Sequence, residues 1–129
     1  MAEVIVDTSI WIQNFRSPNS PEALELDRLL ASGEVYMVGI VYAELLRGAG
    51  TEVLSQMLEA DLNNLPFLDA TRDTWRATGR LMASLQHQGM SIALPDVAIA
   101  ALALQYDIPV FTRDHHFERI EGIKLHEIN

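Results

Sequence analysis

The chain of 129 residues contains no cysteine, which excludes disulfides, thiolate metal sites and chemistry based on a cysteine nucleophile. It also lacks a long hydrophobic run. Its most apolar stretch, Ile92 to Leu104, is interrupted by Pro95 and Asp96 and is too short to span a bilayer. The residues after Met1 resemble neither a basic leader nor the apolar part of a signal peptide. We therefore expect a soluble, cytoplasmic protein with no membrane association.

Positive charge is also scarce. The nine cationic residues include a single lysine, Lys124, the others being arginines, and the formal net charge is −9. A protein that binds nucleic acid by charge alone is expected to be basic. Arginine nevertheless binds phosphate bidentately and stacks on bases, so a few well-placed arginines can hold RNA. The excess of acid fits either a solvated surface or carboxylates that gather to hold cations.

The hydrophobic pattern alternates short β-rich runs with longer helical ones, and it contains no repeat, linker or low-complexity tract. The predicted strands cover residues 4–6, 35–38, 66–68, 110–112 and 124–128. The predicted helices cover residues 8–15, 41–47, 51–62, 71–88 and 95–106, with a further one between Ser20-Pro21 and Gly33. Strands separated by helices predict an α/β sandwich with a mainly parallel sheet, in one domain.

Four acids fall where such a sheet would bind a ligand, because ligands collect at the carboxyl ends of parallel strands. Asp7 directly follows the strand 4–6, and Asp114 follows the strand that ends at Thr112. Asp96 lies in the first turn of an apolar helix that we expect to be buried. Glu44 lies in an apolar helix, where a free carboxylate is poorly solvated. We therefore expect the four acids to meet over one sheet edge.

Clustered carboxylates need a partner, because two of them about 4 Å apart repel by ~4 kcal/mol at an effective dielectric constant of about 20. Such a cluster persists by binding protons or divalent cations. Ligands that are all oxygen suit Mg²⁺ or Mn²⁺, which polarises a phosphodiester and lowers the pKa of an attacking water. The hydroxyls of Thr8, Ser9 and Thr112 are placed to orient ligands or a phosphate oxygen. This is the chemistry of a hydrolytic phosphodiesterase.

Each of these residues also has a purely structural explanation. The three aspartates can cap helix starts, a position that Asp favours, and Glu44 can be a solvated helix-face acid. The hydroxyls are typical of turns and caps. His115 and His116 are adjacent at a helix start, so they point in different directions and we expect them to be exposed. Arg47 and Arg113 are candidates for RNA contact, although surface charge explains them equally well.

The whole pattern resembles that of a PIN-domain ribonuclease, in particular a VapC-type toxin. The matching pieces are Val6–Ser9, Tyr42–Gly48, Leu94–Ala100 and Val110–Phe117. Each is weak alone, but the four in this order and spacing are specific and cover essentially the full chain. By this resemblance, the acids match the family's catalytic and metal-binding quartet and the hydroxyls match its supporting residues: Asp7, Glu44, Asp96 and Asp114, with Thr8, Ser9 and Thr112.

The resemblance implies a single PIN-like nuclease domain over residues 1–129, a three-layer α/β/α sandwich whose five-stranded sheet has the order 3-2-1-4-5. It implies Mg²⁺- or Mn²⁺-dependent endonucleolytic cleavage of single-stranded RNA. Such proteins usually form homodimers and are typically encoded beside an antitoxin, VapB-like, whose C-terminal segment covers the metal site. The antitoxin's N-terminal half binds the operator, so contact with DNA is indirect. The chain departs from the pattern at His116, where many relatives carry a further acid that bears on a second metal.

Two other classes of function compete with a nuclease. A phosphoryl-acceptor domain would use a strand-end Asp and a lysine at a late strand end, but Arg113 follows Thr112 and Lys124 lies too far on. A dehalogenase-type phosphatase would need a second Asp two residues after Asp7, where Ser9 stands. The second class is a non-catalytic PIN-fold binding module. It has no reason to keep clustered charge, so the presence of all four acids favours the nuclease.

Overall fold

The strand β1 (Val4–Val6) is buried along its whole length and lies inside the sheet of the computed structural model, which describes residues 2–128. The other elements follow in chain order: α1 (Thr8–Arg16), α2 (Pro21–Ala31), β2 (Val35–Val38), α3 (Gly39–Arg47), α4 (Glu52–Leu62), β3 (Phe67–Leu68), α5 (Arg72–His87), α6 (Leu94–Tyr106), β4 (Val110–Phe111) and the 3-10 helix η1 (His115–Arg119). This alternation of strands and helices confirms the predicted α/β class.

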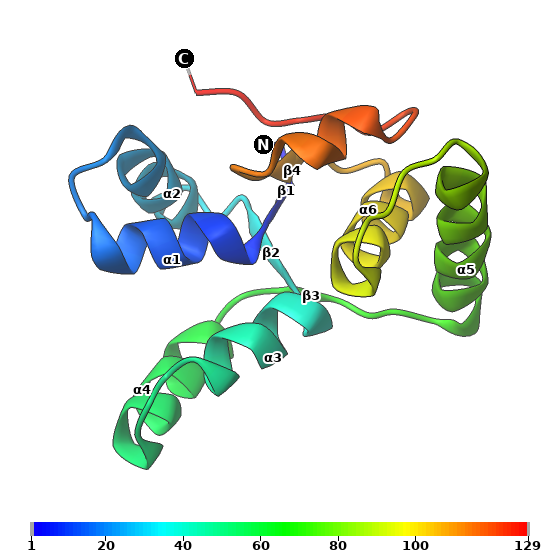
Figure 1. Ribbon diagram of the computed structural model, residues 1–129. Helices are drawn as coiled ribbons and strands as arrows, with labels where there is room; N and C mark the ends of the chain where they lie inside the picture. The colour runs from blue at the N-terminus through cyan, green and yellow to red at the C-terminus, as the bar shows by residue number, and fades with distance from the viewer. Residues whose placement is uncertain (1, 129) are drawn as a thin grey trace.

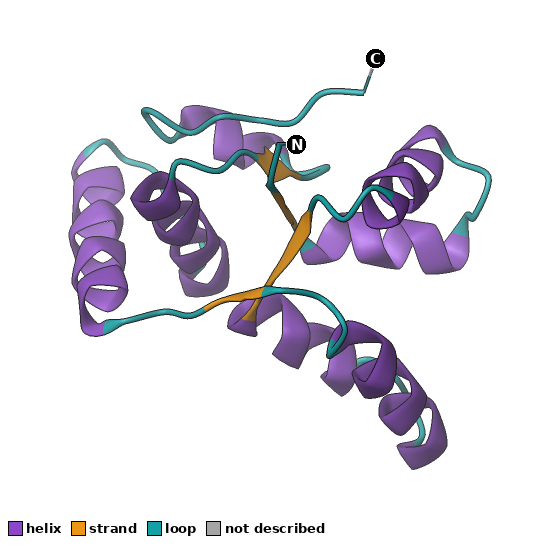
Figure 2. Cartoon of the chain, turned by 180° about the vertical axis from the view of Figure 1, so that it is seen from behind, coloured by secondary structure: helices purple, strands orange, loops and turns teal. Residues whose placement is uncertain are grey.

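The described strands pair in parallel in the order β3-β2-β1-β4. In this register Val4 faces Val35, and Ile5 faces both Tyr36 and Val110, so the strands end at one common edge. The sheet lies between the pair α1 and α2 and the pair α5 and α6 (Figure 1). The α3–α4 hairpin extends away from the strands, as the view from behind also shows (Figure 2). The predicted sandwich and the order of the first four strands are therefore confirmed.

The fifth strand, predicted over residues 124–128, is reduced to a single parallel bridge between Leu125 and Val110. The Val110 N–H donates to the Lys124 carbonyl, and the His126 N–H donates to the Val110 carbonyl, both over 2.9 Å. The segment thus lies at the expected edge of the sheet. The prediction of a full strand was wrong because β4 ends one residue after Val110 and offers no longer ladder.

Local capping signals set three of the helix starts. Ser20 accepts a hydrogen bond from a backbone N–H of the first turn of α2, with Pro21 at the first helical position, and Thr51 and Thr71 do the same for α4 and α5. The starts predicted at these positions are confirmed. The helix α3 has no such cap and begins at Gly39, two residues before the predicted start, because it continues directly from β2.

The helix α6 supplies much of the core. Residues 97–103 are all buried, and the alanines among them allow close packing against the sheet. Burying a large apolar side chain contributes roughly 1.5–3 kcal/mol, so the start of α6 is firmly positioned. With 13 residues, α6 is nevertheless far too short for a bilayer. Within residues 2–128, no other helix has the length and apolarity to cross a membrane either.

Candidate active site

Asp7 ends β1 and begins α1, at the point where the sheet gives way to helices. It occupies the capping position of α1, yet within the described residues its side chain makes no capping hydrogen bond. Its Oδ2 instead accepts hydrogen bonds from Ser9 Oγ (2.9 Å) and Thr112 Oγ1 (2.8 Å). The side chain is only 2% exposed. The structure therefore holds Asp7 by two hydroxyls, and capping does not account for this acid.

Asp96 and Asp114 reach the same edge of the sheet from two other elements. Asp96 lies in the first turn of α6, and Ala93, not Asp96, is the capping residue. Asp114 precedes η1, and its backbone N–H donates to Thr112 Oγ1 (3.0 Å). Both acids are half-buried. Thr112 therefore links Asp7 to Asp114, because its hydroxyl donates to the carboxylate of Asp7 and accepts from the backbone N–H of Asp114.

Glu44 comes from α3, the helix that follows the carboxyl end of β2. Its Oε1 accepts a hydrogen bond from Thr8 Oγ1 (2.8 Å), and the side chain is half-buried. Its charge raises the pKa of Asp96, which places the two acids within electrostatic reach of each other. Glu44 is therefore oriented toward the site by a hydroxyl from the first turn of α1.

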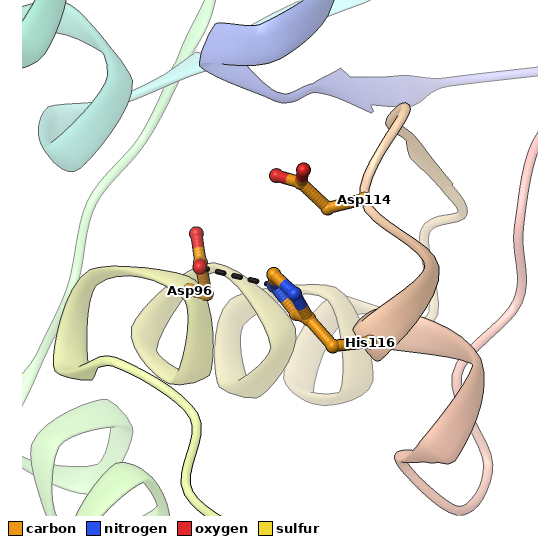
Figure 3. Close-up of side chains that lie close together, drawn as sticks. All are labelled: Asp96, Asp114 and His116. Carbon is orange, nitrogen blue, oxygen red and sulfur yellow. Dashed lines mark hydrogen bonds and ion pairs between the residues drawn. The ribbon is translucent and has the colours of Figure 1, made fainter.

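The tightest grouping at this edge contains a histidine. One ligand atom each from Asp96, Asp114 and His116 lies within 4.8 Å of the other two. His116 Nε2 is 3.0 Å from Asp96 Oδ2. Figure 3 shows the three side chains close together, with Asp96 on α6, Asp114 directly before η1 and His116 within η1. Asp7 and Glu44 lie outside this trio, but the charges of Asp96 and Asp114 raise the pKa of Asp7, and the charge of Glu44 raises the pKa of Asp96.

The pKa values of Asp7 and Asp96 are raised, which reflects burial and the repulsion between neighbouring carboxylates. Burial raises the pKa of Asp7 above its ordinary value of 3.8, the two hydroxyl hydrogen bonds oppose this, and the charges of Asp96 and Asp114 add to it. Burial also raises the pKa of Asp96. His116 lowers that pKa, and Asp114 and Glu44 raise it. The structure thus brings Asp96 and Asp114 together and links Asp7 and Glu44 to them through charge, while the meeting of all four acids stays a prediction.

The donor set suits a hard divalent cation. Both side-chain hydrogen bonds that the described residues give to Asp7 end on Oδ2, which leaves Oδ1 available. Within residues 2–128, no lysine or arginine forms an ion pair with the four acids, and Lys124 Nζ pairs instead with Asp107 (2.8 Å) beyond the end of α6. Mg²⁺ and Mn²⁺ are bound by carboxylate oxygens. The residues present therefore fit a divalent metal, and the same pairing of Lys124 removes the lysine that a phosphoryl-acceptor site would need.

The two candidate arginines are placed differently. Arg113 follows β4; its N–H donates to Ser9 Oγ (3.1 Å) and its Nη1 donates to Gln13 Oε1 (2.7 Å). Its Nε lies 3.7 Å from Glu22 Oε1. Arg47 is exposed in the last turn of α3. Arg113 is therefore fixed beside the acids, whereas Arg47 lies at the end of the helix that carries Glu44.

A groove of about 490 Å³ opens beside Asp114. Its walls are the start of α2, the segment from β4 to η1 and the C-terminal residues. Thr112, Arg113, Glu118 and His126 are among the residues that line it. Of the four acids, only Asp114 lines this groove. The groove thus adjoins the acidic edge at Asp114 and includes Arg113.

Sequence reasoning missed the position of His116. The side chain of His115 is 91% exposed, as expected, but that of His116 is 35% exposed and contacts Asp96. The expectation that both histidines are exposed is therefore wrong for His116, because the turn into η1 directs its ring toward α6. The available signals were its position two residues after Asp114 and the further acid that many relatives carry at this position. No signal in the sequence pointed to Gln13 and Glu22, which contact the side chain of Arg113.

Comparison with known proteins identifies the family. A model of the PIN domain matches residues 4–123, which include all four acids. Ribonuclease VapC11 of Mycobacterium tuberculosis is 30% identical over 124 residues, which cover 93% of this chain and 92% of that protein.

Two solved structures share the fold. DNA-bound VapBC from Salmonella typhimurium is 23% identical with a TM-score of 0.82, over 100% of both chains. VapBC-5 from M. tuberculosis, described as a member of the VapBC family of toxin-antitoxin systems, is 25% identical with a TM-score of 0.64, over 96% of this chain and 94% of that chain. The chain therefore belongs to the PIN domain family, and its relatives within that family include VapC ribonucleases.

Proposed function

We propose that this chain is a Mg²⁺- or Mn²⁺-dependent endoribonuclease that cleaves single-stranded RNA, the toxin of a VapBC-type pair. The observation that carries the proposal is the convergence of Asp7, Glu44, Asp96 and Asp114 from four elements, with the pKa values of two of them raised by burial and by the charges of the others. A buried cluster of like charges is costly unless a cation neutralises it. Its relative from M. tuberculosis carries the name ribonuclease, which supports the same reaction class.

The roles of the residues follow from their placement. Asp7, Asp96 and Asp114 hold the cation, and Glu44 completes the set of acids. When bound, a divalent cation polarises the phosphodiester and makes water a better nucleophile. The hydroxyls of Ser9 and Thr112 fix the carboxylate of Asp7, and that of Thr8 fixes Glu44, so the acids are oriented before the cation arrives.

RNA binding depends on local positive charge, since the chain as a whole carries −9. Arg113 lines the groove beside Asp114, where a guanidinium can meet a phosphate next to the cleaved bond. Arg47, exposed at the end of α3, is the second contact. Together they would hold the RNA backbone along both sides of the acids.

The partners follow from the relatives. A structure described as DNA-bound VapBC and another described as a toxin-antitoxin system share this fold. We infer a cognate VapB-like antitoxin, a homodimer of this chain in the cytoplasm, and contact with DNA only through the antitoxin. Two sets of exposed apolar side chains support two protein interfaces. Phe15, Val53 and Met57 lie on α1 and α4, and Trp75 and Leu104 lie on α5 and α6.

The test is cleavage of a labelled single-stranded RNA pool by the purified protein without its partner, in Mg²⁺, in Mn²⁺ and in EDTA. The variants Asp7→Asn and Asp96→Asn run beside it, with Asp73→Asn on the exposed face of α5 as a matched control. Cleavage that needs the metal, falls at least about 100-fold in the two site variants and persists in the control is expected. Equal cleavage by all four proteins would reject the assignment.

A further inference from the structure

The ring of His116 is held in place on two sides. Its Nε2 lies 3.0 Å from Asp96 Oδ2, and the ring stacks on Phe117 with centroids 5.1 Å apart and an interplanar angle of 27°. Phe117 is fully buried. A side chain at the surface loses conformational entropy when it is fixed in this way. His116 therefore presents Nε2 to the acids from a pre-organised position.

The distances fit coordination. Two adjacent ligands of an octahedral cation with bonds of about 2.1 Å lie about 3.0 Å apart, and two opposite ligands about 4.2 Å apart. The separation of His116 Nε2 and Asp96 Oδ2 is 3.0 Å, and one ligand atom from each of Asp96, Asp114 and His116 lies within 4.8 Å of the other two. A cation can thus bind all three with only small movements of the side chains.

A purely structural role for His116 is the competing explanation. In that case Nε2 donates a hydrogen bond to Asp96 and only orients that carboxylate, as a partner behind a metal ligand does. That explanation accounts for the contact with Asp96 alone. It leaves unexplained why Asp114, an acid from another part of the chain, also has a ligand atom within 4.8 Å of one from His116 and one from Asp96, which is the grouping that a cation needs.

We propose that His116 is a metal ligand through Nε2, and that this nitrogen makes the site prefer first-row transition cations to Mg²⁺. The inference rests on the metal dependence proposed above and adds the kind of cation. Imidazole binds Co²⁺ more tightly than Mn²⁺. Mg²⁺ favours oxygen ligands and gives up its waters reluctantly. The contribution of His116 should therefore grow from Mg²⁺ through Mn²⁺ to Co²⁺.

The first test is pulsed electron paramagnetic resonance of the protein loaded with less than one equivalent of Mn²⁺. A coordinated imidazole couples the electron spin of Mn²⁺ to a nitrogen nucleus. We expect this coupling in the wild type and its loss in His116→Asp. The control His115→Asp should keep the coupling, because the side chain of His115 is 91% exposed. His116→Gln serves as a second variant without added charge, and circular dichroism verifies that each variant is folded.

The second test is calorimetric titration of the same proteins with Mg²⁺, Mn²⁺ and Co²⁺. The ratio of Co²⁺ to Mg²⁺ affinity should fall by about an order of magnitude in His116→Asp, and the ratio of Mn²⁺ to Mg²⁺ by less. Bound Mn²⁺ without nitrogen coupling, or coupling that survives in His116→Asp, overturns the inference and leaves the metal dependence standing. A protein that binds none of the three cations overturns both.

Discussion

Two carboxyl groups of this chain expose less than a tenth of their residue's surface, yet their pKa values move in opposite directions. Asp7 is 2% exposed, and burial raises its pKa. Glu25 on α2 is 8% exposed, and its pKa is lowered to about 2, chiefly by the hydrogen bonds from Arg28. Burial alone therefore does not decide the state of a carboxyl group in this fold.

The neighbours of the two groups differ in sign. Arg28 donates to both oxygens of Glu25 (2.7 and 3.0 Å), and His126 contacts the second oxygen, which ties the C-terminal segment to α2. Asp7 receives only neutral hydroxyls, and the charges around it are negative. The chain supplies a cation to one buried acid and none to the other. On the function proposed above, Asp7 depends on a cation from outside, whereas Glu25 belongs to the scaffold.

The largest effect that tests this comparison is stabilisation by metal. A cation at about 100 times its dissociation constant should stabilise the native wild type by about 2.7 kcal/mol. For a domain of this size that raises Tm by roughly 10 °C. Asp7→Asn should lose most of this increment, because it removes a ligand, and Glu25→Gln should keep it. Thermal unfolding with Mn²⁺ and with EDTA measures both.

The comparison fails if Glu25→Gln loses the increment as completely as Asp7→Asn does. That result would mean that the metal binds near α2 and the C-terminal segment. Asp73→Asn provides the matched control, since Asp73 is 70% exposed and pairs only with Arg76 on its own helix. Its increment should equal that of the wild type.

The surroundings of Asp7 could be predicted from the sequence to a large degree. The buried strand Val4–Val6 and the apolar helix that carries Asp96 follow from local periodicity and from the alternation of elements, whereas the order of the strands was implied by the family resemblance. The position of Asp114 at the same edge follows from the topology, since parallel strands end together. Local patterns therefore suffice where a site is built from the ends of regular elements.

The surroundings of Glu25 show what local patterns leave out. The pairing with Arg28 has the spacing of neighbours on a helix, but His126 lies 101 residues further along the chain. Such a contact depends on how the last segment crosses the sheet edge, and this segment forms only a bridge where a strand was predicted. His116 differs from its neighbour for the same reason: the course of η1 decides which ring faces α6.

An intermediate effect is expected from removing the charge of the scaffold acid. Glu25→Gln should lower the free energy of unfolding by about 1–2 kcal/mol at pH 7, a modest value because solvent screens the partly exposed Arg28. The pKa of Glu25 is lower in the folded state than the ordinary 4.5. The stabilisation is therefore full above pH 4.5 and is lost as the pH falls through about 2.

Urea unfolding of wild type and Glu25→Gln from pH 7 to pH 2 measures this difference. The exposed Glu121→Gln, which changes the same charge, should differ little from the wild type at any pH. A penalty for Glu25→Gln that stays constant down to pH 2 would contradict the ion pair and point to packing alone.

The smallest expected effect is a gain in stability, in contrast to the loss expected for Glu25→Gln. Without metal, Asp7→Asn should raise the stability at pH 7 by about 1 kcal/mol, or roughly 4 °C in Tm, because it removes a buried charge that lies near two others. The pKa of Asp7 is higher in the folded state than the ordinary 3.8. The penalty of the wild type is therefore full above that raised pKa and absent below 3.8, where the carboxyl group is protonated in both states.

Thermal unfolding in EDTA, at neutral pH and at acidic pH, tests this sign. The gain from Asp7→Asn should disappear on acidification, while Ser9→Ala, which removes one hydroxyl donor and leaves the charge, should destabilise at neutral pH. Asp7→Asn removes the charge, whereas Ser9→Ala removes a hydrogen bond and keeps the charge. Stability changes of opposite sign in the two variants would therefore show that the charge of Asp7 is what destabilises the metal-free protein. A loss of stability in Asp7→Asn at pH 7 without metal would show that the two hydroxyls already satisfy the carboxylate. In that case the acidic edge would need no cation to be stable, and the comparison with Glu25 would no longer distinguish a binding site from a scaffold.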